Sequence, residues 1–318
     1  MDFVAVLSKH FRTALSYKYR LKIMDDHHVA LETAILPQYQ GSAAFMERFL
    51  VAAHEEGAAI ERSVNNEKIK LVDRSELDAD VFTYFDENKA AFRTEFTNEL
   101  EGRLSPEQFD EFCEVIASEW FDGKRLREHG RPRRLKRSVH DYLQKIIGNS
   151  FTADHLVKVK DDLANVVPLI SVEAVAAILT VNDQMIFRHI EEWKRNHPNY
   201  DNLSNSDIFL RRGLSLDGKL DTSSPYCEWD FVNSYSIAFS APEKFSQMMK
   251  GKTPAIVNAE LALFDGRILF FSPFIPGMDV GQLEFGVIPS EKRLSIHAQG
   301  IHGGILEYII DPAPFQRG

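Results

Sequence analysis

The feature that most constrains this chain is a change in its hydrophobic pattern near residue 200. Before it, helix-forming residues dominate and apolar residues recur at spacings of three and four, as in amphipathic helices. After it, short apolar-rich segments with partial alternation are separated by Gly, Pro and Asp, which is typical of strands. Helices in one block and strands in the next predict an α+β fold or two separate domains, with a mostly helical part over residues 1–200 and a strand-rich part over residues 201–318.

Local signals place some of the helices. Residues 41–59 carry an amphipathic pattern. Ser105 followed by Pro106 reads as an N-cap with proline at the first helical position, opening a helix that continues through Ile116. A further helix is expected to open at Ser171 and to run to about Trp193, before the sequence Asn-His-Pro-Asn stops it.

The second block contains six strand-like segments and one short helix. The helix is expected to begin at Ala241-Pro242-Glu243-Lys244-Phe245. The predicted strands lie within IFLRRGLSL (208–216), WDFVNSYSIAF (229–239), AIVNAELALF (255–264), RILFFSPF (267–274), QLEFGVIP (282–289) and GILEYIIDP (304–312).

Composition excludes several classes of protein. The net charge of −10 is not that of a chain that binds nucleic acid over its whole surface. Two cysteines form neither a disulfide framework nor a zinc site. Charges interrupt the apolar residues at the N-terminus, and no run of apolar residues reaches the length of a membrane span. The expected location is therefore the cytoplasm.

Three short motifs of the second block occur in a notable order. They are Arg211-Arg212-Gly213 near the end of a strand, Ser234-Tyr235-Ser236 before the short helix, and Gln282-Leu283-Glu284 before a proline. In order, spacing and context, residues 205–315 resemble the mono-ADP-ribosyltransferases of the Arg–Ser–Glu class. The resemblance implies an ADP-ribosyltransferase-like sandwich, with NAD as co-substrate and no metal ion.

The resemblance also implies roles for these residues. Glu284 would stabilise the oxocarbenium-like ribose of the transition state, with Ser234 orienting it. The residues implied to bind NAD are Arg212, Gly213, Tyr235 and Ser236. Arg212 precedes the glycine as in the family, whereas Arg211 points to the other strand face. The family usually has threonine where Tyr235 stands, so this ring either stacks on nicotinamide or belongs to the core, while Ser236 also supports the adjacent loop.

Gln282 is expected on the same strand face as Glu284, and the resemblance links this position to the choice of acceptor. Glutamine there accompanies asparagine acceptors, as in Rho-modifying exoenzymes, and nucleobase acceptors, as in pierisin-like enzymes. The preceding loop, residues 272–281, would contact the acceptor through Phe274 or Met278. An anti-phage toxin that modifies RNA would fit this organisation, with an antitoxin or other inhibitor protein as a possible partner.

A basic segment, Lys124–Arg137, reverses the overall charge with eight Lys or Arg residues and one acid. It predicts a surface for nucleic acid or for an acidic partner, unless it is a solvated charged helix. The residues proposed for this surface are Arg125, Arg127, Arg131, Arg133, Arg134, Lys136 and Arg137.

Two other functions stay open. The second block could keep the fold without turnover and act as a docking module. Alternatively, the carboxylates of Asp217, Asp221 and Glu228 could serve a metal-dependent phosphoryl-transfer or nuclease site.

Overall fold

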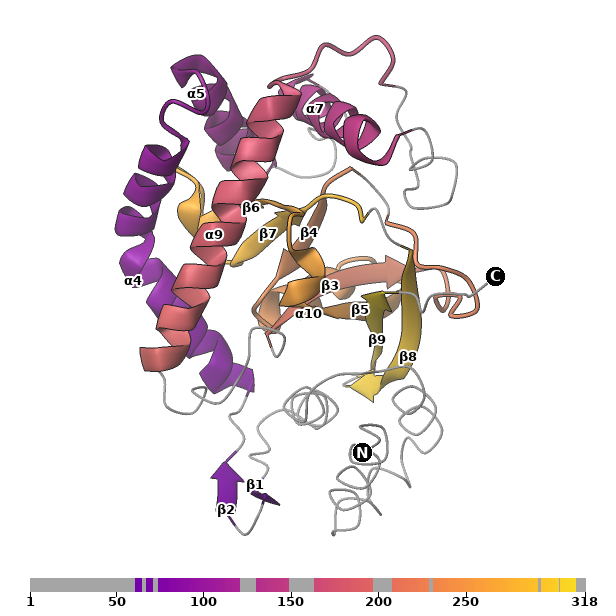
Figure 1. The fold of residues 1–318 in the computed structure, drawn as a ribbon. Coiled ribbons are helices and arrows are strands. Elements are labelled where there is room, and N and C mark those ends of the chain that lie inside the picture. Colours follow the sequence, from indigo (N-terminus) through magenta and orange to yellow (C-terminus); the bar gives the residue numbers. More distant parts are fainter. Residues whose placement is uncertain are drawn as a thin grey trace, which may run out of the picture.

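The computed structural model describes residues 61–64, 67–70, 74–120, 130–148, 163–196, 208–228, 231–290, 293–302 and 304–312. The expected helix over residues 41–59 and the expected domain boundary at residue 200 lie outside these ranges. Within them, helices come first and a mixed sheet follows, which confirms the α+β class (Figure 1).

The helical part ends near residue 196. Its elements, after a short hairpin of β1 (Glu61–Val64) and β2 (Glu67–Lys70), are α4 (Arg74–Leu100), α5 (Pro106–Glu114), the π-helix η1 (Val115–Trp120), α7 (Gly130–Ile147) and α9 (Val172–Asn196).

The expected helix starts at Ser105 and Ser171 are confirmed. The Ser105 hydroxyl accepts from the backbone N–H of Gln108 at 3.3 Å, and the Gln108 side chain accepts in return from the Ser105 N–H. This reciprocal capping box satisfies N–H groups that the first helical turn leaves free. At α9, the Ser171 hydroxyl accepts from the N–H of Ala174 at 3.1 Å.

The strands from β3 onward form one seven-stranded sheet in the order β6-β7-β4-β3-β5-β9-β8, separate from the β1–β2 hairpin. Neighbouring strands are antiparallel except for β5 and β9. The elements are β3 (Phe209–Leu216), β4 (Asn233–Ser236), α10 (Ser240–Ser246), β5 (Thr253–Glu260), β6 (Ile268–Phe271), β7 (Glu284–Val287), β8 (Leu294–His302) and β9 (Ile305–Pro312), with 3-10 turns η4 (Leu261–Phe264) and η5 (Ser272–Phe274).

The helices and the sheet share one hydrophobic core. Figure 1 shows α9 crossing over the β6–β7 edge, with α4 beside it. Phe85 of α4 meets Phe271 of β6 edge to face, with ring centroids 4.9 Å apart, and Asn182 of α9 donates to the carbonyl of Leu269 at 2.9 Å. The side-chain amide therefore joins α9 to an edge strand. None of the described helices is both long enough and apolar enough to cross a membrane.

Candidate active site

A row of buried polar side chains crosses the centre of the sheet. Strand pairing sets Arg211 opposite Asn258 on one side and opposite Ser236 on the other, and sets Ser236 opposite Glu284. Directly opposed residues in antiparallel strands point to the same face. The Ser272 hydroxyl continues this row by accepting from the Glu284 N–H at 3.0 Å. We call these five residues the polar row, and each is at most 6% exposed.

Within the polar row, Glu284 is the residue whose burial contributes least plausibly to the stability of the folded protein. Its carboxylate is 5% exposed, and Oε1 accepts from the indole N–H of Trp120 at 3.2 Å. Within the described residues, no cation forms an ion pair with it. A buried carboxylate without a counter-ion costs several kcal/mol by order of magnitude, so a functional reason is expected.

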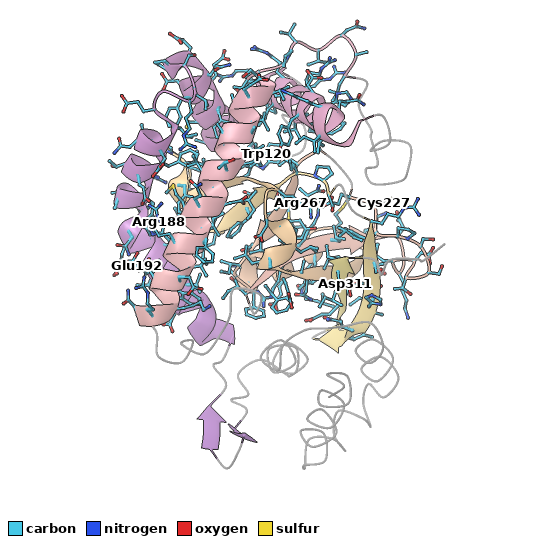
Figure 2. The ribbon with its side chains drawn as sticks, viewed as in Figure 1. Trp120, Arg188, Glu192, Cys227, Arg267 and Asp311 are labelled. Carbon is cyan, nitrogen blue, oxygen red and sulfur yellow. The ribbon has the colours of Figure 1, made fainter. Side chains whose placement is uncertain are left out.

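Glu228 shows the usual way in which this fold buries a carboxylate. It is 1% exposed, forms an ion pair with Arg267, and accepts from the backbone N–H of Ser290 at 2.6 Å. Figure 2 labels Arg267 within the sheet region of the molecule. The contrast shows that Glu284 lacks the compensation that the other carboxylate receives.

The expectation that Gln282 shares a strand face with Glu284 is wrong. Strand β7 begins at Glu284, and Gln282 lies in the preceding turn. Between them Leu283 has φ of 43°, a left-handed conformation that costs a non-glycine residue about 1–3 kcal/mol. This turn breaks the alternation on which the expectation depended. The carbonyl of Gln282 is held by the Ser236 hydroxyl at 2.6 Å.

The sequence predicted that Ser234 would lie beside Glu284, but the serine of β4 opposite Glu284 is Ser236. Ser234 lies opposite Gly286, two pairs farther along the strands. Ser236 donates to Gln282 and accepts from the N–H of Ala238 at 3.0 Å, so it supports the turn that leads into Glu284. The buried Ser234 hydroxyl makes no hydrogen bond to any described residue, and so it does not hold Glu284.

Tyr235 belongs to the core on the opposite face of the sheet. It pairs with Phe285 and lies between the two serines, so its ring points away from Glu284. The ring is 2% exposed and packs against Phe264 with centroids 4.7 Å apart. Burial raises the pKa of its hydroxyl well above the usual value. Of the two alternatives in the sequence analysis, this arrangement favours the core residue.

Strand register also separates the two arginines. Arg211 belongs to the polar row, stacks on the Phe239 ring at 3.5 Å, and donates through Nη1 to the carbonyls of Phe209 and Ile237, each at 3.0 Å. Arg212 points to the other face and donates to the side chain of Asn233. The arginine on the Glu284 face is therefore Arg211 and not Arg212, while the choice of Arg212 as the phosphate ligand stays a prediction.

Gly213 has a packing reason to be glycine. A Cβ atom there would lie 2.1 Å from the carbonyl oxygen of Pro242 and 2.9 Å from the backbone nitrogen of Ser246. Both atoms belong to α10, which thus packs directly on β3 beside Arg211. The structure gives Gly213 this structural role at the edge of the site.

The larger side chains of the loop over residues 272–281 are packed inside the protein. Phe274 is fully buried and Met278 is 2% exposed, so neither side chain is presented to an acceptor. Phe274 meets Phe92 of α4 with centroids 5.6 Å apart, and Arg93 of the same helix donates to the Met278 carbonyl. The expectation of an acceptor-contacting tip at these two residues is therefore wrong in this structure.

The described part of the basic segment is largely engaged within the protein. Arg131 pairs with Glu114 at 2.7 Å and also with Glu119, and these carboxylates raise the pKa of the guanidinium. Arg134 and Arg137 contact carboxylates and backbone carbonyls, and Lys136 is buried. Arg133 is partly buried, while Arg125 and Arg127 lie outside the described residues. These contacts are those of a structural helix face.

The carboxylates considered for metal-dependent chemistry do not converge. Asp217 pairs with Lys252, and Asp221 accepts from the hydroxyls of Ser223 and Ser224, which lower its pKa to about 2. Glu228 is committed to its own buried ion pair. Among the described residues, no group of three or more His, Cys, Asp or Glu side chains could hold a metal ion. The nuclease alternative thus has no support from geometry.

Three residues of this site were not found from the sequence. Asn258 joins the polar row through strand pairing, Ser272 joins it through a hydrogen bond from the Glu284 N–H, and Trp120 reaches it from the helical part. A serine in a turn or an asparagine in a strand carries no local functional signal. Trp120 is 164 positions from Glu284, so only the tertiary fold brings them together.

Comparisons with known proteins find few relatives. No protein-family model and no curated protein matches this chain. Among solved structures it is similar to Vis toxin, an ADP-ribosyltransferase from Vibrio splendidus, with 10% identity, a TM-score of 0.32, and coverage of 81% of this chain and 89% of that one. Vis in complex with the M6 inhibitor gives 10% identity and a TM-score of 0.29 over the same shares. Because this similarity is so low, the function is inferred from the geometry of the site and not from these structures.

Proposed function

We propose that this chain is an NAD-dependent ADP-ribosyltransferase with Glu284 as its catalytic carboxylate. The observation that carries the proposal is a buried carboxylate that forms no ion pair with any described residue and lies in one row with Arg211 and Ser236. A negative charge kept in a poorly solvated place acts strongly on a positive charge that develops beside it.

The reaction needs such a charge. The bond between the ribose C1′ and the nicotinamide nitrogen breaks, and its electron pair leaves with nicotinamide. The ribose then resembles an oxocarbenium ion, which the Glu284 carboxylate would stabilise. An acceptor nucleophile bonds to C1′ and loses a proton. NAD thereby brings a positive charge to Glu284, which pairs with no cation among the described residues.

Arg211 and Ser236 would have separate roles. Arg211 places a positive charge on the Glu284 face, where a guanidinium suits the oxygens of a pyrophosphate. Ser236 fixes the turn before Glu284 through the Gln282 carbonyl, so it sets where strand β7 begins. In this proposal Ser234 faces the same side as Glu284 but does not orient it.

The proposal covers nucleic-acid and protein acceptors. Among the described arginines of the basic segment, Arg131, Arg134 and Arg137 pair with carboxylates of the protein, so this part of the segment does not decide between the two acceptors. Gln282, in the turn that Ser236 anchors, remains the residue proposed to face an acceptor. A role as a toxin or effector, with or without an inhibitor protein, would follow from the same activity and is tested by expressing the chain and its Glu284→Gln variant in growing cells.

One observation favours the alternative of a docking module. The 5% exposure of Glu284 means that the ribose reaches the carboxylate only after side chains around it move. A module without turnover needs no such movement. The same assay separates the two functions, because only the enzyme releases nicotinamide from NAD.

The test uses purified chain, NAD labelled in the adenylate part, and whole-cell lysate. Glu284→Gln removes the charge with little change in shape, and Asp217→Asn makes the same change at an exposed carboxylate as the matched control. We expect Glu284→Gln to lower nicotinamide release by about 100-fold or more, by analogy with the loss of one electrostatic stabiliser, and Asp217→Asn to keep it. Nuclease and protease digestion then identify the acceptor. Wild-type protein that releases no nicotinamide under any condition would refute the enzyme and leave the docking module.

A further inference from the structure

Trp120 joins the helical part of the chain to the candidate catalytic strand. It is the last residue of η1, is fully buried, and donates its indole N–H to Oε1 of Glu284. Figure 2 shows Trp120 where the helices meet the sheet. Among the described residues, Trp120 is the side chain that donates a hydrogen bond to the Glu284 carboxylate.

The indole packs against the sheet, and an ion pair holds the residue before it on the helical side. Its ring meets Phe270 at 73°, with centroids 5.9 Å apart, and Phe270 lies directly over Gly286, where a Cβ atom would meet its ring at 2.0 Å. Glycine at position 286 therefore makes room for Phe270, and Phe270 forms one wall for Trp120. On the helical side, Arg131 of α7 pairs with Glu119, the neighbour of Trp120.

The backbone at Trp120 is also unusual. Helix α5 changes at Val115 into the π-helix η1, which ends at Trp120, and both Val115 and Ile116 are fully buried. Each turn of a π-helix is wider than an α-helical turn, so side chains emerge at different angles, and π segments recur at functional sites. Here the widened turn ends on the residue that faces the carboxylate.

The neutrality of the donor is the chemical point. A lysine or arginine in this place would neutralise Glu284 and leave less negative charge for the ribose cation. An indole N–H gives a charge-assisted hydrogen bond that fixes the direction of the carboxylate without cancelling its charge. It also occupies Oε1, so Oε2 is the oxygen left to face the substrate.

We propose that Trp120 is a positioning residue for Glu284, holding Oε1 so that Oε2 faces the ribose of NAD. This inference rests on the proposed function, since a positioning residue requires a reaction. It assigns to a residue of the helical part the orienting role that the sequence resemblance gave to Ser234. The helices before residue 196 thereby become part of the catalytic arrangement.

The first measurement is kinetic. Trp120→Phe removes the donor and keeps an aromatic ring, while Trp193→Phe makes the same change at an equally buried tryptophan in the last turn of α9. We expect Trp120→Phe to lower kcat for nicotinamide release by about 10- to 100-fold, the range for losing a hydrogen bond to a charged group. We expect KM for NAD to change by less than about threefold, because Trp120 acts on the carboxylate and not on binding. Trp193→Phe should keep kcat.

The second measurement is spectroscopic and needs no turnover. The chain has three tryptophans, so a ¹⁵N-labelled sample gives up to three indole N–H signals, and Trp120→Phe identifies one of them by its loss. Glu284→Ala removes the acceptor, so we expect it to shift this signal and to leave the other indole signals in place. This arm stays decisive if Trp120→Phe folds poorly.

The outcomes distinguish the two proposals. An active wild type, an inactive Glu284→Gln and a fully active Trp120→Phe would overturn the role of Trp120 and keep the enzyme. If the Trp120 indole signal keeps the same chemical shift in Glu284→Ala, the positioning role of Trp120 is also overturned. A wild type that never releases nicotinamide would remove the reaction, and the positioning role with it.

Discussion

Replacing Gly213 by alanine tests how α10 is seated on the Glu284 face of the sheet. The new Cβ atom would lie 2.1 Å from the Pro242 oxygen, and 2.9 Å from both the Pro242 carbonyl carbon and the Ser246 nitrogen. All three are backbone atoms, so no rotamer change relieves the overlap. Non-bonded heavy atoms settle at about 3.5–4.0 Å, so α10 would have to move away from β3 by roughly 1 Å or more.

The expected loss follows from two opposing terms. Forcing an extra carbon into a packed region typically costs about 1–3 kcal/mol. Alanine in place of glycine inside a strand restores about 0.5–1 kcal/mol, because glycine loses more conformational freedom on folding. We therefore expect Gly213→Ala to lower the free energy of unfolding by about 1–2 kcal/mol.

Gly218 is the matched control. A Cβ atom there would meet nothing within 4 Å. Alanine at this position should be neutral or stabilising by up to about 1 kcal/mol, through the entropy of the unfolded chain. The assay is urea unfolding of the full chain followed by circular dichroism. Equal urea midpoints for Gly213→Ala and Gly218→Ala would refute the direct packing of α10 on β3. The binding role that the sequence predicted for Gly213 would then be the remaining reason for a glycine at this position.

Two further predictions concern Glu228, which is buried, and Asp183, which is partly buried. Glu228→Gln should lower the free energy of unfolding by about 3 kcal/mol at pH 7, because it leaves the charge of Arg267 without its partner; a loss below about 1 kcal/mol in urea unfolding would contradict this account. Burial raises the pKa of Asp183 to about 7 from a usual 3.8, so the unfolded state releases this proton at lower pH and stability falls as pH rises between these values. Asp183→Asn keeps an acceptor for the Gly266 N–H, so it should be more stable than the wild type at pH 8 and equal to it below pH 3.8, as measured by thermal unfolding across pH.

Local chemistry made much of the fold predictable. Ser105 and Ser171 predict the starts of their helices, because capping needs only a side-chain oxygen and the free N–H groups of the next few residues. Strand β3 follows from its apolar run, and α10 from the proline and acid near its start. The change from helical to strand patterns likewise needs only the nearest neighbours in sequence.

The site itself depended on register, which local pattern does not set. Whether Arg211 or Arg212 faces Glu284 is a one-residue question, and strand pairing decides it. The turn before β7 could not be foreseen either, because Leu283 adopts a conformation that leucine disfavours and that only the surrounding contacts impose. Alternation predicted Gln282 beside Glu284, and one left-handed residue removed it from that face.

Long-range pairing explains the remaining differences. The basic segment looked exposed because its partners, Glu111, Glu114 and Glu119, lie on the preceding helical elements and not beside it in sequence. Phe274 and Met278 looked like the tip of a loop because their cover, α4, is about two hundred positions away. In both cases the residue types were identified correctly, but their surroundings come from the tertiary fold.

Two buried carboxylates in the same sheet region, Glu228 and Glu284, differ in the partners that stabilise their negative charge. Glu228 has an arginine and a backbone N–H, which is the arrangement expected when a charge must be buried for stability alone. Glu284 has an indole and no cation among the described residues, although Arg211 lies in the same row of side chains. If stability were the only requirement, a neutral residue at position 284 would serve better. The uncompensated charge is therefore the feature that an oxocarbenium-forming reaction explains and that a purely structural role does not.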